Sequence, residues 1–194
     1  MIVRIRFFCL VLVLLSPGPL LAVDEIPGIK EAPPGGDFTL RSAAGPVSLK
    51  DHRGKLVFLY FGYTKCPDVC PTSLAFLAQA LNQFSDQELR QIQPIFVSVD
   101  PKRDTPQLLK EYAEYFHPGF LGVTGTEQEV AAAAELYGAQ YYEVELEGSA
   151  FGYSVNHSAV TYLITQDGTL RFIFPHGTAP EVLVEAARYL LAGS

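Results

Sequence analysis

The chain of 194 residues has no internal repeat, no low-complexity tract and no cluster of basic residues. Acidic residues outnumber basic ones by 21 to 14, which gives a formal net charge of −7. A nucleic-acid-binding protein presents a basic face, so the charge balance argues against that class and predicts no nucleic-acid partner. The length favours one compact domain over two.

The apolar run at the amino end is too short to span a bilayer, because a spanning helix needs about 20 apolar residues. This run, residues 7–15, follows Arg4 and Arg6 and precedes the turn-forming segment 16–19. The layout predicts a secretory signal peptide over residues 1–22, with an uncleaved membrane anchor as the alternative. Cleavage removes both arginines and changes the net charge from −7 to about −9.

Cysteine is scarce, and one of the three, Cys9, lies within the predicted leader. Loss of the leader leaves Cys66 and Cys70. Because the space outside a bacterial inner membrane is oxidising, two cysteines in an exported chain are ordinarily interpreted as a disulfide. An inert structural disulfide is therefore one hypothesis for this pair.

Residues 23–36 are rich in proline and glycine and predict a tether that leads into a single domain over residues 37–194. Apolar periodicity and turn signals then indicate the elements of that domain. In order, they are an edge hairpin (38–40 with 47–49), a central buried strand (56–63), a helix (72–84), a buried strand (94–99), helices over 106–116 and 127–137, a hairpin (159–165 with 169–174) and a last helix after residue 178.

This order of elements predicts an α/β, thioredoxin-like fold. A strand-helix-strand unit comes first, and a strand-strand-helix unit comes last. An amino-terminal β-hairpin precedes the first unit, and two helices are inserted between the units. The helix starts carry capping signals: Asp104 or Thr105 for the first inserted helix, the box Thr126 to Glu129 for the second, and Thr178 with Glu181 for the last.

The segment from Cys66 to Pro71 lies between the carboxyl end of the central strand and the next helix, where ligands bind in open α/β sheets. The helix N-terminus favours thiolates, and we expect Cys70 to ionise more readily than Cys66. Pro67 and Pro71 predict that neither cysteine adopts helical backbone angles. Three residues separate the cysteines where a redox thioredoxin has two, so the spacing favours a metal site without excluding a disulfide.

His157 precedes the strand 159–165, which the thioredoxin topology places beside the cysteine loop. Redox members of the fold usually carry a cis-proline at this point, whereas this chain has Asn156-His157-Ser158. Two thiolates and an imidazole suit copper as Cu(I) or Cu(II), while zinc more often recruits a fourth ligand. The alternative is that His157 only packs or forms hydrogen bonds.

The run from Tyr60 to Pro71 closely resembles the signature of the Sco/SenC proteins, copper chaperones involved in assembling cytochrome c oxidase. Further similarity to this family lies in the segments 35–40, 98–106, 122–125 and 157–163. The resemblance covers roughly residues 35–191.

The resemblance implies that Cys66, Cys70 and His157 are the copper ligands. Two neighbours depart from the family pattern, because Lys65 stands where a histidine is common and Asn156 stands where an aspartate is common. Both changes alter charge beside a ligand, so we expect them to affect copper affinity and redox poise rather than the ligand set.

The function implied is that of a non-catalytic metallochaperone in the periplasm, with contact to the membrane only through an uncleaved amino-terminal segment. It would deliver copper, as Cu(I), Cu(II) or both, toward the CuA site of a haem-copper oxidase. Its partners would be the CuA-bearing subunit and other copper chaperones. The alternative is an enzyme, a thiol-disulfide oxidoreductase with Cys66 as nucleophile and Cys70 as the resolving thiol.

Other polar and aromatic residues have simpler interpretations. Asp68 is expected to stabilise a turn, and His117 to act as a cation at a helix C-terminus. Asp100 and Arg103 predict a local ion pair, with partner docking as the alternative. The remaining candidates are expected to be non-ligand histidines (His52, His176) and core aromatic residues, or else a docking wall (Tyr141, Tyr142, Phe151, Tyr153).

Overall fold

The computed structural model describes residues 33–148 and 152–193. The predicted leader 1–22, most of the predicted tether 23–36, and Phe151 lie outside these ranges. No helix within them is both long enough and apolar enough to cross a membrane.

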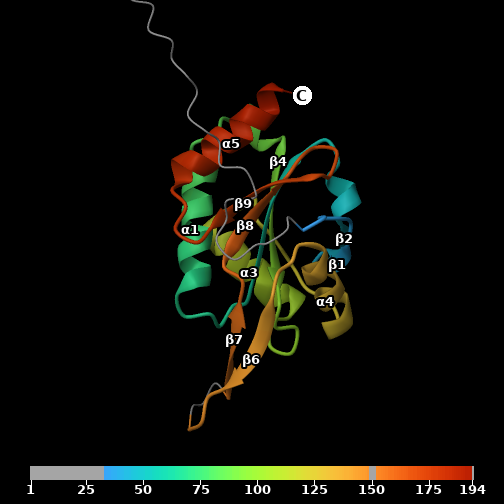
Figure 1. The fold of residues 1–194 in the computed structure, drawn as a ribbon, viewed down its shortest axis with the longest axis vertical. Coiled ribbons are helices and arrows are strands. Elements are labelled where there is room, and N and C mark those ends of the chain that lie inside the picture. The colour runs from blue at the N-terminus through green and yellow to red at the C-terminus, as the bar shows by residue number, and fades with distance from the viewer. Residues whose placement is uncertain (1–32, 149–151, 194) are drawn as a thin grey trace, which may run out of the picture.

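A five-stranded sheet forms the centre of the domain, in the order β5-β4-β3-β8-β9 (Figure 1). β3 pairs in parallel with β4 and antiparallel with β8, and every residue of β3 is buried. The prediction of a central strand covered on both faces is confirmed. The strands of this sheet are β3 (Leu56–Gly62), β4 (Ile92–Ser98), β5 (Leu121–Val123), β8 (Val160–Ile164) and β9 (Leu170–Pro175).

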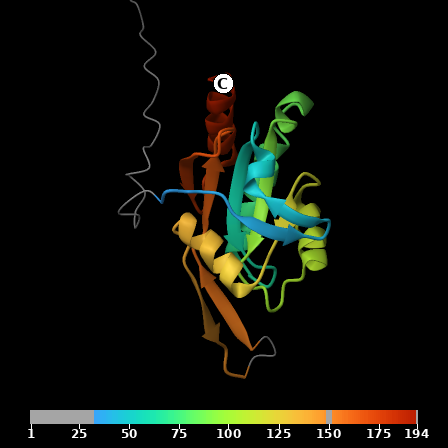
Figure 2. The ribbon, with the colours of Figure 1, turned by 90° about the vertical axis from the view of Figure 1, so that its right-hand side faces the viewer.

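Helices cover both sides of the sheet: α1 packs against α5 on one side, and α4 lies on the other beside the amino-terminal hairpin (Figures 1 and 2). The units β3-α1-β4 and β8-β9-α5 make the predicted thioredoxin-like arrangement, with α3 and α4 inserted between them. The helices are α1 (Val69–Leu81), α2 (Asp86–Leu89), α3 (Pro106–Phe116), α4 (Glu127–Leu136) and α5 (Pro180–Ala192).

Two of the three predicted helix caps are confirmed. Thr105 accepts a hydrogen bond from the Leu108 amide, and Thr126 forms the capping box with Glu129. The prediction for α5 is wrong, because its N-cap residue is Ala179 and the Thr178 hydroxyl instead donates to the carbonyl of Pro175. Pro180 at the first helical position supplies a helical φ without needing a capped amide.

The amino-terminal hairpin consists of β1 (Thr39–Ser42) and β2 (Gly45–Ser48), followed by a 3-10 helix (Leu49–His52). The hairpin was predicted, but it forms a separate two-stranded sheet. Reciprocal backbone hydrogen bonds between Arg41 and Thr124 tie it to the chain just after β5. Upstream, the Gly35 amide donates to the Leu136 carbonyl, so the last residues of segment 23–36 contact α4.

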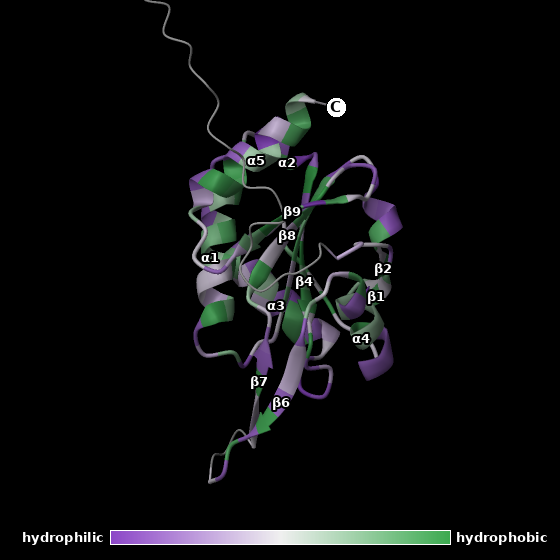
Figure 3. Cartoon of the chain, in the orientation of Figure 1, coloured by the Kyte–Doolittle hydropathy of each residue, from purple (hydrophilic) through white to green (hydrophobic). Residues whose placement is uncertain are grey.

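A second hairpin, β6 (Tyr141–Glu145) with β7 (Tyr153–His157), projects from the body of the domain (Figures 1 and 2). The sequence analysis did not predict it. Figure 3 shows apolar residues along the central strands, whereas this hairpin mixes polar and apolar residues. Most of β6 is exposed, so it lacks the buried alternating face that marks a strand in sequence. The short elements β5 and α2 were also not predicted.

Candidate metal centre

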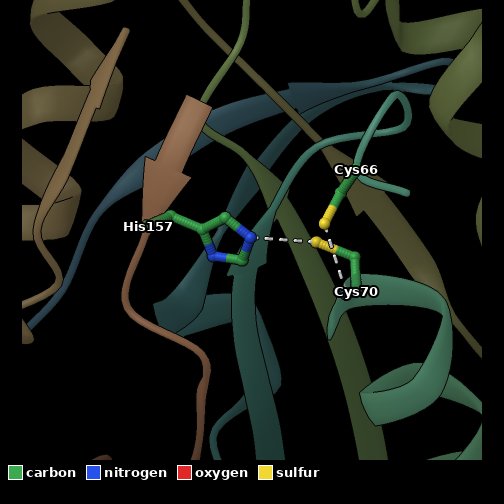
Figure 4. A group of neighbouring side chains, drawn as sticks. All are labelled: Cys66, Cys70 and His157. Atoms are coloured by element: carbon green, nitrogen blue, oxygen red, sulfur yellow. Dashed lines mark hydrogen bonds between the residues drawn. The ribbon is translucent and has the colours of Figure 1, made fainter. Parts of the chain in front are cut away.

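Cys66, Cys70 and His157 converge at one end of the central sheet (Figure 4). One ligand atom from each, a sulfur or a ring nitrogen, lies within 4.8 Å of the other two. The two cysteines are free thiols. Within residues 33–148 and 152–193, no other group of three or more histidine, cysteine or acidic side chains has this arrangement.

The strand order explains why residues 87 positions apart meet. Cys66 follows the carboxyl end of β3, and β8 runs antiparallel to β3 with Thr161 opposite Tyr60. The amino end of β8 therefore lies at the same edge of the sheet as the cysteine loop. His157, the last residue of β7, is three residues upstream of β8 and reaches that edge.

The backbone prediction holds for Cys66 and is wrong for Cys70. Cys66 lies in the loop before α1, whereas Cys70 is the second residue of that helix. Pro71 is tolerated at the third helical position because the first amides of a helix have no intrahelical acceptor. The Cys70 sulfur is thus placed by a rigid helix and the Cys66 sulfur by a loop.

The two thiols differ in the opposite sense from the prediction. The Cys70 amide points at the Cys66 sulfur, 3.5 Å away. Hydrogen bonding from the Cys70 thiol, and then from His157, lowers the pKa of Cys66 to about 4. Burial raises the pKa of Cys70, whose side chain is fully buried. The helix N-terminus acts on Cys66, while Cys70 loses hydration, and desolvation disfavours its thiolate.

This asymmetry predicts selective alkylation in the reduced, metal-free chain. At about pH 6, an ordinary cysteine with a pKa near 8.5 is only ~0.3 % thiolate. Cys66, with its depressed pKa, is ionised there. We expect iodoacetamide to modify Cys66 much faster than Cys70, as measured by peptide mass spectrometry. Equal rates in the folded protein would contradict the assignment, and unfolding in urea should equalise them.

His157 is oriented as a ligand through Nε2. That nitrogen lies 3.2 Å from the Cys70 sulfur, and Nδ1 lies 3.2 Å from the carbonyl oxygen of Ser158. A carbonyl oxygen only accepts, so Nδ1 is the donor in this contact and Nε2 is the nitrogen that faces the cysteines, as in many metal-binding histidines. The rings of Tyr60 and Tyr63 meet the imidazole at near right angles, with centroids 6.2 and 5.8 Å away.

The cysteine site also requires the glycine that ends β3. A Cβ atom at Gly62 would lie 2.6 Å from the Cys70 sulfur and 2.9 Å from the Phe96 ring. No real side chain tolerates such contacts, so any larger residue would displace the sulfur. Gly62 and the two tyrosines are part of the site that sequence reasoning did not single out, although all three lie in the motif from Tyr60 to Pro71.

Several other predicted roles have mixed outcomes. His117 does not serve as a cation, because its Nδ1 accepts the Gly119 amide and burial lowers its pKa. Asp68 occupies the N-cap position of α1 without a side-chain capping bond. The predicted ion pair of Arg103 with Asp100 is present. Asn156 donates to the Tyr142 hydroxyl on the exposed hairpin.

None of the remaining candidates joins the metal cluster. His176 lies 2.9 Å, through Nδ1, from the hydroxyl of Ser73 on α1. His52 is in the 3-10 helix and is not part of the metal cluster. Lys65 is exposed beside Cys66. The group therefore offers a metal ion two sulfurs and one nitrogen, a donor set for soft or borderline ions.

Known proteins share this sequence pattern and this fold. The family model described as SCO1/SenC matches residues 27–192. An SCO2-like protein from Rickettsia felis is 38% identical over 152 residues, which are 78% of this chain and 74% of that protein.

Solved structures agree with the sequence comparison. The crystal structure of Arabidopsis thaliana ScoI with copper bound has a TM-score of 0.75 and 35% identity, covering 82% of this chain and 99% of that one. The solution structure of apo Sco1 from Thermus thermophilus has a TM-score of 0.74 and 36% identity, covering 84% of this chain and 94% of that one. Since the family model spans most of the sequence and these relatives share both identity and fold, the chain belongs to the SCO1/SenC family.

Proposed function

We propose that this protein binds one copper ion through Cys66, Cys70 and His157 and carries it in the assembly of cytochrome c oxidase. The convergence of two thiols and an imidazole at the edge of the sheet is the observation that carries the proposal. Copper bound to a relative of the same fold supports the choice of metal. The CuA-bearing oxidase subunit is the proposed acceptor, and other copper chaperones are the proposed donors.

The donor set fits copper chemically. Thiolate sulfur is a soft ligand that favours Cu(I), while a neutral imidazole nitrogen contributes to Cu(II) binding. Cys66 already has thiolate character, and Nε2 of His157 faces the Cys70 sulfur. Three protein ligands leave room for a further ligand from an acceptor protein, as transfer of the ion from one protein to another requires.

The proposal includes an exported location. Residues 1–22 would direct export, or remain as a membrane anchor, and residues 23–36 would connect them to the domain over 37–194. The layout of charged, apolar and turn-forming residues at the amino end supports this part. A periplasmic location would place the copper site on the same side of the membrane as an exported oxidase domain, so that the two could meet.

Copper stoichiometry tests the function. The reduced full chain, with Cys9→Ser to leave only the two site cysteines, should bind one copper ion in either oxidation state. Dialysis followed by metal analysis measures the ratio, and competition with a chelator specific for each state measures affinity. Two site-bound ions per chain, or none, would refute the single-cluster assignment.

The second candidate is a thiol-disulfide oxidoreductase. Cys66 has thiolate character and could attack a disulfide, and the buried Cys70 beside it could then resolve the mixed disulfide. The two candidates separate in a His157→Ala chain. If this variant binds copper like the parent but no longer catalyses disulfide exchange, the result would favour the enzyme.

A further inference from the structure

The ligands of the site come from two sheets, the central sheet and the β6-β7 hairpin, whose strands do not pair with each other. Both cysteines follow β3 of the central sheet, whereas His157 ends a hairpin that forms its own two-stranded sheet. Its distance from the cysteines is therefore set by the short link from His157 to β8 and by side-chain contacts along β7. The loop between β4 and α3, residues 99–105, supplies such contacts.

One end of this loop holds the hairpin. The carboxylate of Asp100, which is 2% exposed, accepts hydrogen bonds from Arg103 Nε and, at 2.7 Å, from the Tyr153 hydroxyl. Arg103 also donates through a terminal nitrogen to the Tyr153 carbonyl at 2.8 Å, and its guanidinium carbon lies 3.7 Å from the centroid of that ring. Tyr153 lies four residues before His157 on β7. Asp100 and Arg103 thus contact its ring, its hydroxyl and its backbone carbonyl.

The other end of the loop holds the cysteine segment. The carboxylate of Asp104, 1% exposed, accepts hydrogen bonds from the Thr64 amide at 2.9 Å and the Thr64 hydroxyl at 2.6 Å. The hydroxyl of Ser98, at the end of β4, donates to the same carboxylate at 2.6 Å. Thr64 lies two residues before Cys66. Asp104 was one of the two residues predicted to cap α3; Thr105 is the cap, and Asp104 anchors the cysteine loop.

A direct contact completes the arrangement. The hydroxyl of Tyr63 accepts the Val155 amide at 3.3 Å, and the Arg103 guanidinium lies 5.7 Å from the Tyr63 ring. Tyr63 and Val155 lie three residues before Cys66 and two before His157, respectively. Buried hydrogen bonds of this kind resist displacement, because breaking one leaves a desolvated polar group without a partner.

We propose that Asp100 and Arg103, through Tyr153, are positioning residues that set the place of His157 relative to Cys66 and Cys70. This inference rests on the proposed copper function and assigns no chemistry to the pair, since neither side chain is a ligand. The proposed effect is on the imidazole ligand alone and leaves the two thiolates in place. Cu(II), which needs the nitrogen ligand, should depend on the pair, and Cu(I), which two thiolates can hold, should not.

The test uses the full chain with two variants. Asp100→Asn with Arg103→Gln removes both charges together, so that no single buried charge is left uncompensated. Tyr153→Phe removes one hydrogen bond and keeps the ring, as a mild second variant. Loss of residues that orient a ligand costs about 10- to 100-fold in metal affinity, so we expect a Cu(II) loss of that size in the double variant. Tyr153→Phe should lose less, and Cu(I) affinity should be unchanged in both.

Lys102→Gln is the matched control. Lys102 bridges the same loop to the same hairpin through Glu143 at 2.6 Å, but both side chains are about half exposed. Exposed ion pairs contribute little, so this variant should bind Cu(II) like the parent. Equal Cu(II) losses in the control and the double variant would overturn the proposal.

A metal-free readout separates this inference from the copper function. Hydrogen exchange of the Val155 amide, and the nuclear Overhauser contact between the His157 and Tyr63 rings, report the hairpin position without copper. We expect faster exchange and a weakened ring contact in the double variant. If both are unchanged, the positioning role is wrong even if copper binds. If the parent chain bound no copper while the double variant still showed these changes, only the copper function would be refuted.

Discussion

Oxidation of Cys66 and Cys70 to a disulfide is expected to abolish binding of both copper states. The thiolate is the metal ligand, and a disulfide sulfur has lost the charge that makes it one. His157 would then remain as the only intact ligand of the group. Loss of a residue that merely orients a ligand costs about 10- to 100-fold in affinity, so loss of two ligands should exceed about 100-fold, or ~2.8 kcal/mol.

The measurement compares one preparation in two states. The full chain carrying Cys9→Ser is oxidised, freed of oxidant and titrated with Cu(I) and Cu(II) against chelators, and then reduced and titrated again. Binding should return on reduction. The control is Cys70→Ser, which cannot form the disulfide and should respond to neither treatment. Tight copper binding by the oxidised chain would remove the cysteines from the ligand set.

Replacement of His157 by alanine should separate the two copper states. Two thiolates hold Cu(I) at low coordination number, whereas Cu(II) prefers more ligands, including nitrogen, and is reduced by unsupported thiolates. We therefore expect a Cu(II) affinity loss of more than about 100-fold, larger than the cost of disturbing an orienting residue, with a small effect on Cu(I). The cysteines should still form a disulfide.

Chelator competition and the visible and magnetic-resonance spectra of the Cu(II) form measure this effect. His176→Ala is a matched control, because this imidazole contacts α1 through Ser73 and lies outside the metal cluster. It should leave both affinities unchanged. A His157→Ala chain that kept the parent Cu(II) spectrum would make His157 an ordinary packing residue at the end of β7.

The central fold was predictable because its signals are local. A continuous apolar run marks a strand buried on both faces, as in β3, and capping residues mark the starts of α3 and α4. The β6-β7 hairpin carries neither signal, since most of β6 is exposed. The start of α1 was predicted too late because Pro71 was interpreted as a barrier, although a first-turn proline is compatible with a helix.

The sequence by itself determined the fold class, because strand burial and turn chemistry are properties of neighbouring residues. Its resemblance to the Sco/SenC family, rather than local spacing, singled out Cys66, Cys70 and His157 as candidate ligands. Only the tertiary structure decided which thiol is acidic and what holds His157 in place. Ionisation of Cys66 depends on the Cys70 thiol and amide that point at it, and on the burial of Cys70 itself. Asp100, Arg103 and Tyr153, the residues proposed to position His157, meet only after the chain has folded.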